Sequence, residues 1–211
     1  MTAERPHSRR RPDTDPQLNV DLERARAGDE ASFVRVFRAM QPGLLRYVRA
    51  LVGAEAEDVV SEAWSQVFRD LDKFHGDFDA FRGWVATIAR YRAIDHLRAR
   101  GRRPTDPVPV EELLERPAQD STEGAALESA ATAAALAAIR SLPKDQAEAV
   151  LLRTVMGLDA KAAGRVLGKR AGAVRAAAFR GLNNLARQLE SEATPSTPRN
   201  TSALASGDEV R

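Results

Sequence analysis

Apolar residues recur along most of this chain at intervals of three and four, and no segment alternates apolar and polar positions with a period of two. This spacing predicts helices at roughly 29–52, 55–72 and 81–100. Further on it predicts a helix from about 130 to Leu142, then helices at 144–156 and 159–167, and a last helix after a turn at 168–170. The pattern therefore indicates an all-α fold.

Three stretches lack this periodicity and divide the chain. Residues 1–17 and 191–211 are rich in Pro, Ser, Thr and charge, a composition that buries too little apolar surface to offset the entropy of ordering, so we expect both to be disordered. Residues 101–129 contain Pro104, Pro107, Pro109 and Pro117, which exclude a long helix. We therefore predict an acidic linker between two small helical domains, 18–100 and 130–190.

Each domain has one helix whose two faces differ clearly. On the helix at 55–72, one face carries Val60, Ala63, Val67 and Leu71, and another carries Asp58, Glu62, Ser65 and Arg69. The last helix is expected to turn inward Val174, Ala178, Leu182, Leu185 and Leu189. The helix at 81–100 has a less regular pattern. Phe81, Val85 and Ile88 are expected to form a buried stripe with Arg90 on the opposite side, whereas Ile94 and Leu97 do not continue this stripe.

Charge is distributed unevenly, which matters more than the net value of +2. The segment 82–103 holds seven arginines against the single acid Asp95. From Asp106 to Glu128 the linker carries seven acidic residues, and Arg116 is the only basic residue among them. From Arg165 to Arg187 the chain is basic and contains no acid. Because phosphate neutralisation needs cations along one surface, this order of charge favours two nucleic-acid-binding segments.

Composition excludes several other functions. The sequence has no cysteine, so disulfides and thiolate metal sites are absent, and its three histidines, His7, His75 and His96, are scattered. No cluster of residues suits catalysis, a cofactor or a metal. No apolar run is long enough to span a bilayer, and the N-terminus lacks a signal-peptide core. We therefore expect a cytoplasmic, non-enzymatic protein without membrane contact.

The segment 159–190 has the pattern of a helix-turn-helix: a short helix capped by Asp159, a turn at Gly168, and a basic second helix. A plain helical hairpin would look similar, and the arginines favour DNA. Ala173, Ala176 and Ala177 are expected to face outward, and alanine cannot hydrogen-bond to a base edge. The pattern predicts phosphate anchoring with little direct base readout.

Aromatic residues accompany the first basic segment, a combination that single-stranded DNA binding uses. For Phe81 and Trp84, packing in the core is a simpler interpretation than contact with bases. Tyr91 fits either the core or a base contact. His96 is expected on a solvated or DNA-facing surface. The acidic face with Asp58 and Glu62 is either ordinary solvated surface or a docking site for a basic helix. The linker is either a spacer or a phosphate mimic for a positively charged channel.

Taken together, these segments resemble the two conserved regions of small sigma-70-superfamily factors of the extracytoplasmic-function (ECF) type. The first match comprises Ala56-Glu57-Asp58-Val59-Val60-Ser61-Glu62-Ala63-Trp64, the segment Phe81–Arg90 and the segment Arg92–Arg98. The second comprises Leu142-Pro143, Gly157-Leu158, Leu167-Gly168, Gly172-Ala173-Val174-Arg175 and Arg180-Gly181-Leu182. The chain departs from the family pattern at Ser61 (usually Gln), Tyr91 (often Asn), Ala162-Ala163-Gly164 (usually Glu-Ile-Ala), and Ala173 and Ala176 (usually Thr and Ser).

The resemblance implies a subunit that directs core RNA polymerase to promoters and helps to melt them. It implies docking on the clamp helices of the largest polymerase subunit by Asp58, Ser61, Glu62, Ser65 and Arg69, contact with the flap of the second subunit, and an anti-sigma partner. For the minus-ten element, double- or single-stranded, it implies Lys73, Phe74, His75, Asp77, Phe78, Trp84, Arg90, Tyr91, Arg92, His96 and Arg98. For the minus-thirty-five element it implies Lys169, Arg170, Ala173, Arg175, Ala176 and Arg180.

Two other functions stay open from the sequence. A helix-turn-helix repressor or activator would leave the Asp58/Glu62 face and the aromatic loop unexplained. A helical adaptor without a DNA role would leave both basic segments unexplained.

Overall fold

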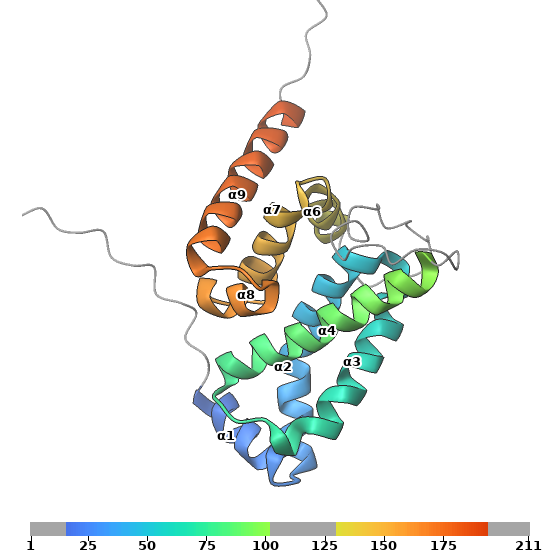
Figure 1. Ribbon diagram of the computed structural model, residues 1–211, viewed down its shortest axis with the longest axis vertical. Coiled ribbons are helices and arrows are strands. Elements are labelled where there is room, and N and C mark those ends of the chain that lie inside the picture. Colours follow the sequence, from blue (N-terminus) through green and yellow to red (C-terminus); the bar gives the residue numbers. More distant parts are fainter. Residues whose placement is uncertain (1–15, 102–129, 194–211) are drawn as a thin grey trace, which may run out of the picture.

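The computed structural model describes residues 16–101 and 130–193, and these form helices and short connections with no strand among them (Figure 1). Gly101, predicted as the first linker residue, ends the last helix of the first half, and the rest of the predicted linker and most of both predicted disordered termini lie outside the described residues. None of the described helices is long and apolar enough to cross a membrane. In chain order the helices are α1 (Pro16–Arg26), α2 (Glu30–Val52), α3 (Ala56–Asp70), α4 (Phe78–Gly101), α6 (Ala130–Arg140), α7 (Lys144–Val150), α8 (Ala160–Leu167) and α9 (Ala171–Ala193).

Helix α1 was not predicted, and residues 16 and 17, which we expected in the disordered terminus, belong to it. It packs against α2 through Leu22, which is buried. The carboxylate of Asp21 is also buried and accepts hydrogen bonds from Arg35 and from the hydroxyl of Ser32 on α2. A buried charge is tolerated when it is paired and hydrogen-bonded in this way.

Helices α2, α3 and α4 enclose the first core, in which Leu44, Val67 and Phe81 are fully buried. The predicted three-helix pattern is confirmed here, although α4 begins at Phe78 rather than at 81. The indole N–H of Trp64 donates to the side-chain oxygen of Gln41 at 2.6 Å and so ties α3 to α2. This bond satisfies the polar group of a residue that is otherwise in the core.

The second half contains the predicted helix-turn-helix. Asp159 caps α8 by accepting from the amide of Ala162 at 2.6 Å, as expected. Gly168 ends α8 in the left-handed conformation, with φ of 66°. The helix predicted at 144–156 is α-helical only as far as Val150, where α7 ends. It continues as a π-helical stretch at Leu151–Val155.

The inward face of α9 differs from the prediction. Val174 and Ala178 are buried and Leu185 is half-buried, but Leu182 and Leu189 are 48% and 61% exposed, so their inward assignment was wrong. Ala177, expected outside, is buried. The cause is Gly181, where a Cβ would lie 2.7 Å from a methyl of Val150. This close approach to α7 rotates the buried face toward the small residues.

The two halves pack against each other. Helix α8 lies against the first half of α4, and the π-helical stretch contacts α2, so that buried apolar residues of both halves form one continuous cluster (Figure 1). The ion pair of Arg90 with Glu148 crosses this contact. The described halves therefore form a single packed unit.

Candidate nucleic-acid interface

Helix α3 exposes an acidic face. Asp58 and Glu62 are one turn apart and both are exposed, as are Ser61 and Ser65. Within the described residues neither Asp58 nor Glu62 has an ion-pair partner, whereas Glu57 lies 3.5 Å from Arg49. The hydroxyl of Ser65 donates to the Ser61 carbonyl of its own helix at 2.9 Å. The two carboxylates are thus available to an external cation.

On the same helix Arg69 is exposed and donates to the side-chain oxygen of Gln66 at 2.8 Å. The five residues expected at this face, Asp58, Ser61, Glu62, Ser65 and Arg69, are therefore all accessible. A helix that presents acids and hydroxyls outward while Val59, Val60 and Val67 anchor it in the core is suited to docking against a basic helix.

A cavity of about 520 Å³ opens where α3, the loop after it and α4 meet. The rings of Phe74 and Trp84 stack with centroids 5.1 Å apart, and Trp84 is only half-buried. The cavity is lined by Gln66, Asp70, Lys73, Phe74, His75, Trp84 and Ile88. It combines an aromatic wall with side chains that can hydrogen-bond, the two features by which proteins recognise an unstacked base.

Hydrogen bonds hold the polar rim of this cavity in place. The ammonium of Lys73 donates to Asp70 at 2.7 Å, which raises the pKa of Lys73 and lowers that of Asp70. His75 Nδ1 lies 2.9 Å from the guanidinium of Arg26 on α1. Lys73 remains exposed, so its charge can still meet a phosphate.

Three lining residues, Gln66, Asp70 and Ile88, were not predicted. A signal was present, because Gln66 and Asp70 are one helical turn apart and continue the polar face of Glu62 toward the loop. Ile88 was assigned to the buried stripe of α4, but it is only partly buried and reaches the cavity.

Several predicted contacts on the loop and α4 have mainly structural positions. Phe74 and Phe78 are 8% and 4% exposed and pack around Phe81, and of the two only Phe74 lines the cavity. Asp77 caps α4 by accepting from the amide of Ala80 at 2.7 Å. His96 is half-buried, and among the described residues its buried Nε2 has no hydrogen-bond partner, so its place on a solvated or DNA-facing surface stays a prediction.

The outward residues of α4 differ in their accessibility. Tyr91 is 63% exposed. Arg92 donates to Gln66 at 3.1 Å beside the cavity, and Arg98 pairs with Asp95 at 3.4 Å on the surface. Arg90, expected to project away from the core, is instead half-buried, and its Nε donates to Glu148 at 3.0 Å. Glu148 lies 58 residues away along the chain, so the sequence pattern gave no sign of this partner.

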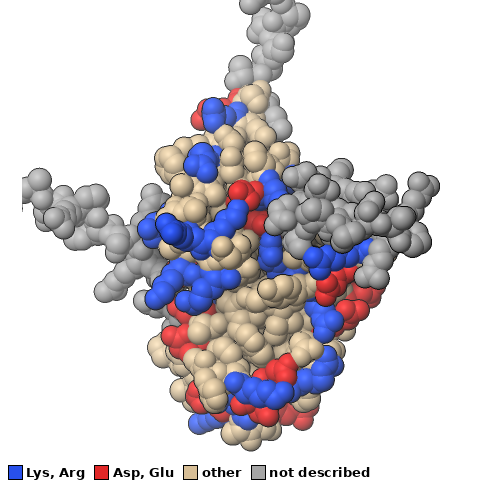
Figure 2. All heavy atoms as spheres, viewed as in Figure 1, with Lys and Arg blue, Asp and Glu red and all other residues tan. Residues whose placement is uncertain are grey.

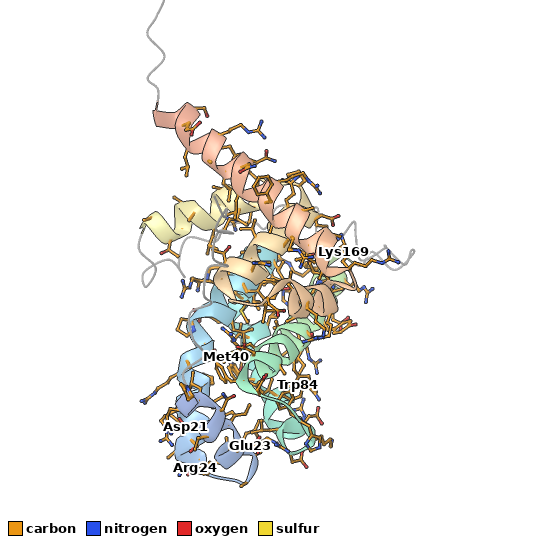
Figure 3. All side chains as sticks on the ribbon, turned by 90° about the vertical axis from the view of Figure 1, so that its left-hand side faces the viewer. Asp21, Glu23, Arg24, Met40, Trp84 and Lys169 are labelled. Atoms are coloured by element: carbon orange, nitrogen blue, oxygen red, sulfur yellow. The ribbon has the colours of Figure 1, made fainter. Side chains whose placement is uncertain are left out.

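The α8–α9 unit presents a basic surface. Arg165, Arg170, Arg175 and Arg180 are exposed, and Lys and Arg side chains gather over α8 and the start of α9 in Figure 2. Lys169 pairs with Asp145 at 2.5 Å and keeps part of its surface accessible. Ala173 and Ala176 face outward, as predicted. Figure 3 shows Lys169 and Trp84 in different halves of the molecule, so the basic surface and the cavity are separate sites.

Comparisons with known proteins agree with this arrangement. The model of "Sigma-70 region 2" matches residues 36–103, and that of "Sigma-70, region 4" matches residues 132–185. The chain is 34% identical to the ECF RNA polymerase sigma factor BldN of Streptomyces coelicolor over 89% of this chain and 72% of that protein. It is 31% identical to the ECF RNA polymerase sigma factor SigD of Mycobacterium tuberculosis, over 80% and 82% respectively.

The fold also matches a solved structure. The sigma factor RpoE of Bartonella quintana, solved in complex with the anti-sigma factor NepR, superimposes with a TM-score of 0.59 at 22% identity, over 75% of this chain and 96% of that one. The chain belongs to the sigma-70 family, among the ECF RNA polymerase sigma factors. It is thus a sigma factor that directs RNA polymerase to specific promoters.

Proposed function

We propose a division of this activity among three surfaces of the molecule. The acidic face of α3 docks on the clamp helices of the largest polymerase subunit. The cavity between α3 and α4 captures an unstacked base of the minus-ten element. The basic surface of α8 and α9 binds the minus-thirty-five duplex, and the polymerase flap contacts this second half.

The observation that carries the proposal is the cavity beside Trp84. A base taken out of a duplex loses its stacking, which costs a few kcal/mol, and an aromatic wall supplies a replacement surface. Lys73 adds a cation at the rim, and Gln66 and Asp70 add groups that can hydrogen-bond to a base edge. Tyr91, exposed farther along α4, offers a second ring for stacking.

The α8–α9 surface suits duplex anchoring rather than extensive base readout. Its arginines can neutralise phosphates along one strand. At the outward positions of α9 where a base-reading helix would carry polar groups, this chain has Ala173 and Ala176. We infer that more of the promoter discrimination comes from the first half than from the second.

Three single substitutions test this partition. Asp58→Arg reverses a docking charge and should abolish binding to core polymerase. Trp84→Ala should leave core binding intact and weaken binding to a minus-ten single strand by roughly 5- to 100-fold. Arg180→Ala should weaken binding to promoter duplexes only. Transcription with purified core polymerase on a genomic promoter library measures the combined result, and failure to start at defined sites would contradict the proposal.

We propose further that the chain has no catalytic activity, acts in the cytoplasm with the polymerase, and is held inactive by an anti-sigma factor. Within the described residues no group of His, Asp and Glu is arranged to hold a metal ion. Co-purification from a cell extract, followed by competition of the captured protein with core polymerase, tests the anti-sigma partner.

A further inference from the structure

The contact between the two halves contains a buried ion pair. Arg90 on α4 donates through Nε to Oε1 of Glu148 on α7 at 3.0 Å, and its Nη2 lies 3.5 Å from Oε2. The side chains are 16% and 5% exposed. The guanidinium is therefore occupied by a carboxylate, and arginine binds carboxylate and phosphate through the same fork of donors.

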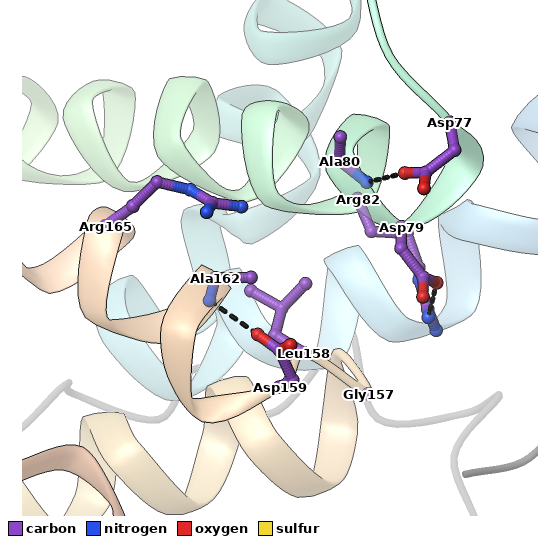
Figure 4. A pocket seen from close by; sticks show the side chains of 9 residues that line it. All are labelled: Asp77, Asp79, Ala80, Arg82, Gly157, Leu158, Asp159, Ala162 and Arg165. Carbon is purple, nitrogen blue, oxygen red and sulfur yellow. Dashed lines mark hydrogen bonds and ion pairs between the residues drawn. The ribbon is translucent and has the colours of Figure 1, made fainter. Parts of the chain in front are cut away.

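Beside this pair the contact is close and made of small groups. Helix α8 crosses the first half of α4 at Gly83, where a Cβ would lie 3.8 Å from the Cβ of Ala162. Figure 4 shows this meeting of α8 with the start of α4, where Ala162 of α8 lies opposite Ala80 and Arg82. The contact covers one side of the helix that carries Trp84 and Tyr91.

Polar groups inside the contact make it easier to open than an apolar one. On separation Arg90 and Glu148 would both regain water, which offsets the loss of their mutual attraction. The hydroxyl of Tyr47 is buried, interacts electrostatically with Glu148 and Arg90, and has no hydrogen-bond partner among the described residues, so water admitted on opening would satisfy it. Both effects lower the cost of opening the contact.

We propose that the described arrangement is a closed state of this chain, in which Glu148 occupies Arg90 in place of a promoter phosphate, and that promoter binding requires the α4 to α7–α8 contact to open. The inference rests on the proposed role of α4 in minus-ten binding. It assigns Glu148, a residue outside every predicted DNA contact, the role of an intramolecular competitor.

A disulfide provides the sharpest test, because the chain has no cysteine of its own. In the double variant Gly83→Cys/Ala162→Cys the two Cβ atoms would have the separation of a disulfide. We expect the oxidised chain to bind a forked promoter DNA at least about tenfold more weakly than the reduced chain, and to recover with dithiothreitol. Each single-cysteine variant is the control and should not respond to oxidation.

The outcomes separate the two proposals. If the disulfide forms, as mass spectrometry shows, and DNA binding is unchanged, the closed state does not restrict binding. If no disulfide forms in the folded chain, the contact is not the solution arrangement. If the reduced variant and the unsubstituted chain, each bound to core polymerase, both fail to bind the minus-ten strand, the proposed role of α4 is wrong, and this inference falls with it.

A charge variant gives a second measurement without a crosslink. Glu148→Gln keeps the shape of the side chain but removes the charge that holds Arg90, so it should raise the affinity for a minus-ten single strand about fivefold, because a larger fraction of the chain is then competent to bind. Asp145→Asn is the matched control on the same helix, since Asp145 faces Lys169 rather than α4. Equal affinities for both variants, with circular dichroism showing both folded, would overturn the competitor role.

Discussion

Two hydrogen bonds join the guanidinium of Arg35 to the carboxylate of Asp21, from Nη2 to Oδ1 at 2.8 Å and from Nε to Oδ2 at 3.0 Å. Together with Ser32 they hold α1 on α2 through a charge that is buried. The bond from Arg35 is the main cause that lowers the pKa of Asp21 below its usual 3.8. The pair therefore links the stability of the first half to pH.

The sign of this link follows from the lowered pKa. A carboxylate whose pKa is depressed on folding contributes stability above its unfolded pKa and loses it as the pH falls through the folded value. Asp21→Asn should therefore lower the free energy of unfolding at pH 7, and the difference from the unsubstituted chain should shrink as the pH falls below about 3.8. Urea unfolding across this range measures it. The exposed Asp58→Asn is the control, and a pH-independent difference would refute the assignment.

Features set by local sequence were predicted well, and those set by distant contacts were not. The cap at Asp159 and the buried ring of Phe81 depend on neighbours a few residues away, so spacing reveals them. Helix α1 was missed because its central buried residue, Asp21, is charged and breaks the apolar pattern. Its partner Arg35 is 14 residues further on.

The buried face of α9 illustrates the same limit. Leu182 and Leu189 were assigned to the core because they are large and apolar, but both are exposed. Gly181 allows α7 to approach so closely that small residues of α9 form the contact. The residues of the candidate site also fall into those that the sequence predicts and those that depend on distant packing. Exposure of the Asp58 face and of Tyr91 agrees with the helical periodicity, whereas the sequestration of Arg90 depends on how two separate helical units pack.

Two glycines on either side of the helix-turn-helix turn should respond oppositely, in free energy of unfolding, to substitution by alanine. A Cβ at Gly164 would lie 2.5 Å from the carbonyl oxygen of Lys169, a backbone atom that cannot move independently. Gly164→Ala should lower the free energy of unfolding by about 1–3 kcal/mol. Gly172→Ala is the matched control, because it has open space and gains helix propensity, with an expected increase of about 0.5–1 kcal/mol. Chemical unfolding measures both, and equal effects would contradict the packing shown here.

The buried hydroxyl of Tyr47 gives an unusual expectation for a core residue. Burial raises the pKa of Tyr47, and its oxygen has no hydrogen-bond partner in the described part of the chain. Tyr47→Phe should leave the free energy of unfolding unchanged or raise it by about 1 kcal/mol, because the cost of an unpaired buried group disappears. Leu44→Ala in the same core should cost about 2–5 kcal/mol. A loss above about 1 kcal/mol in Tyr47→Phe would indicate a partner for the hydroxyl.

The two tryptophans allow base capture to be observed directly. Trp64 is buried and bonded to Gln41, whereas Trp84 borders the cavity. Binding of a minus-ten single strand should therefore quench Trp84 and leave Trp64 almost unaffected. Fluorescence titration of Trp64→Phe should retain the quenching, and that of Trp84→Phe should lose it. Quenching that persists in Trp84→Phe would place the bound base elsewhere.

Salt dependence distinguishes phosphate anchoring from base readout on α9. Each arginine that contacts a phosphate releases a counterion from the duplex, and its removal should reduce the slope of log K against log salt by about one. Arg175→Ala, on the exposed side of α9, should therefore weaken binding to duplexes of any sequence by a similar factor and flatten the slope. Filter binding between 50 and 200 mM salt measures both quantities for promoter and unrelated duplexes. A loss confined to the promoter sequence would show instead that Arg175 reads a base.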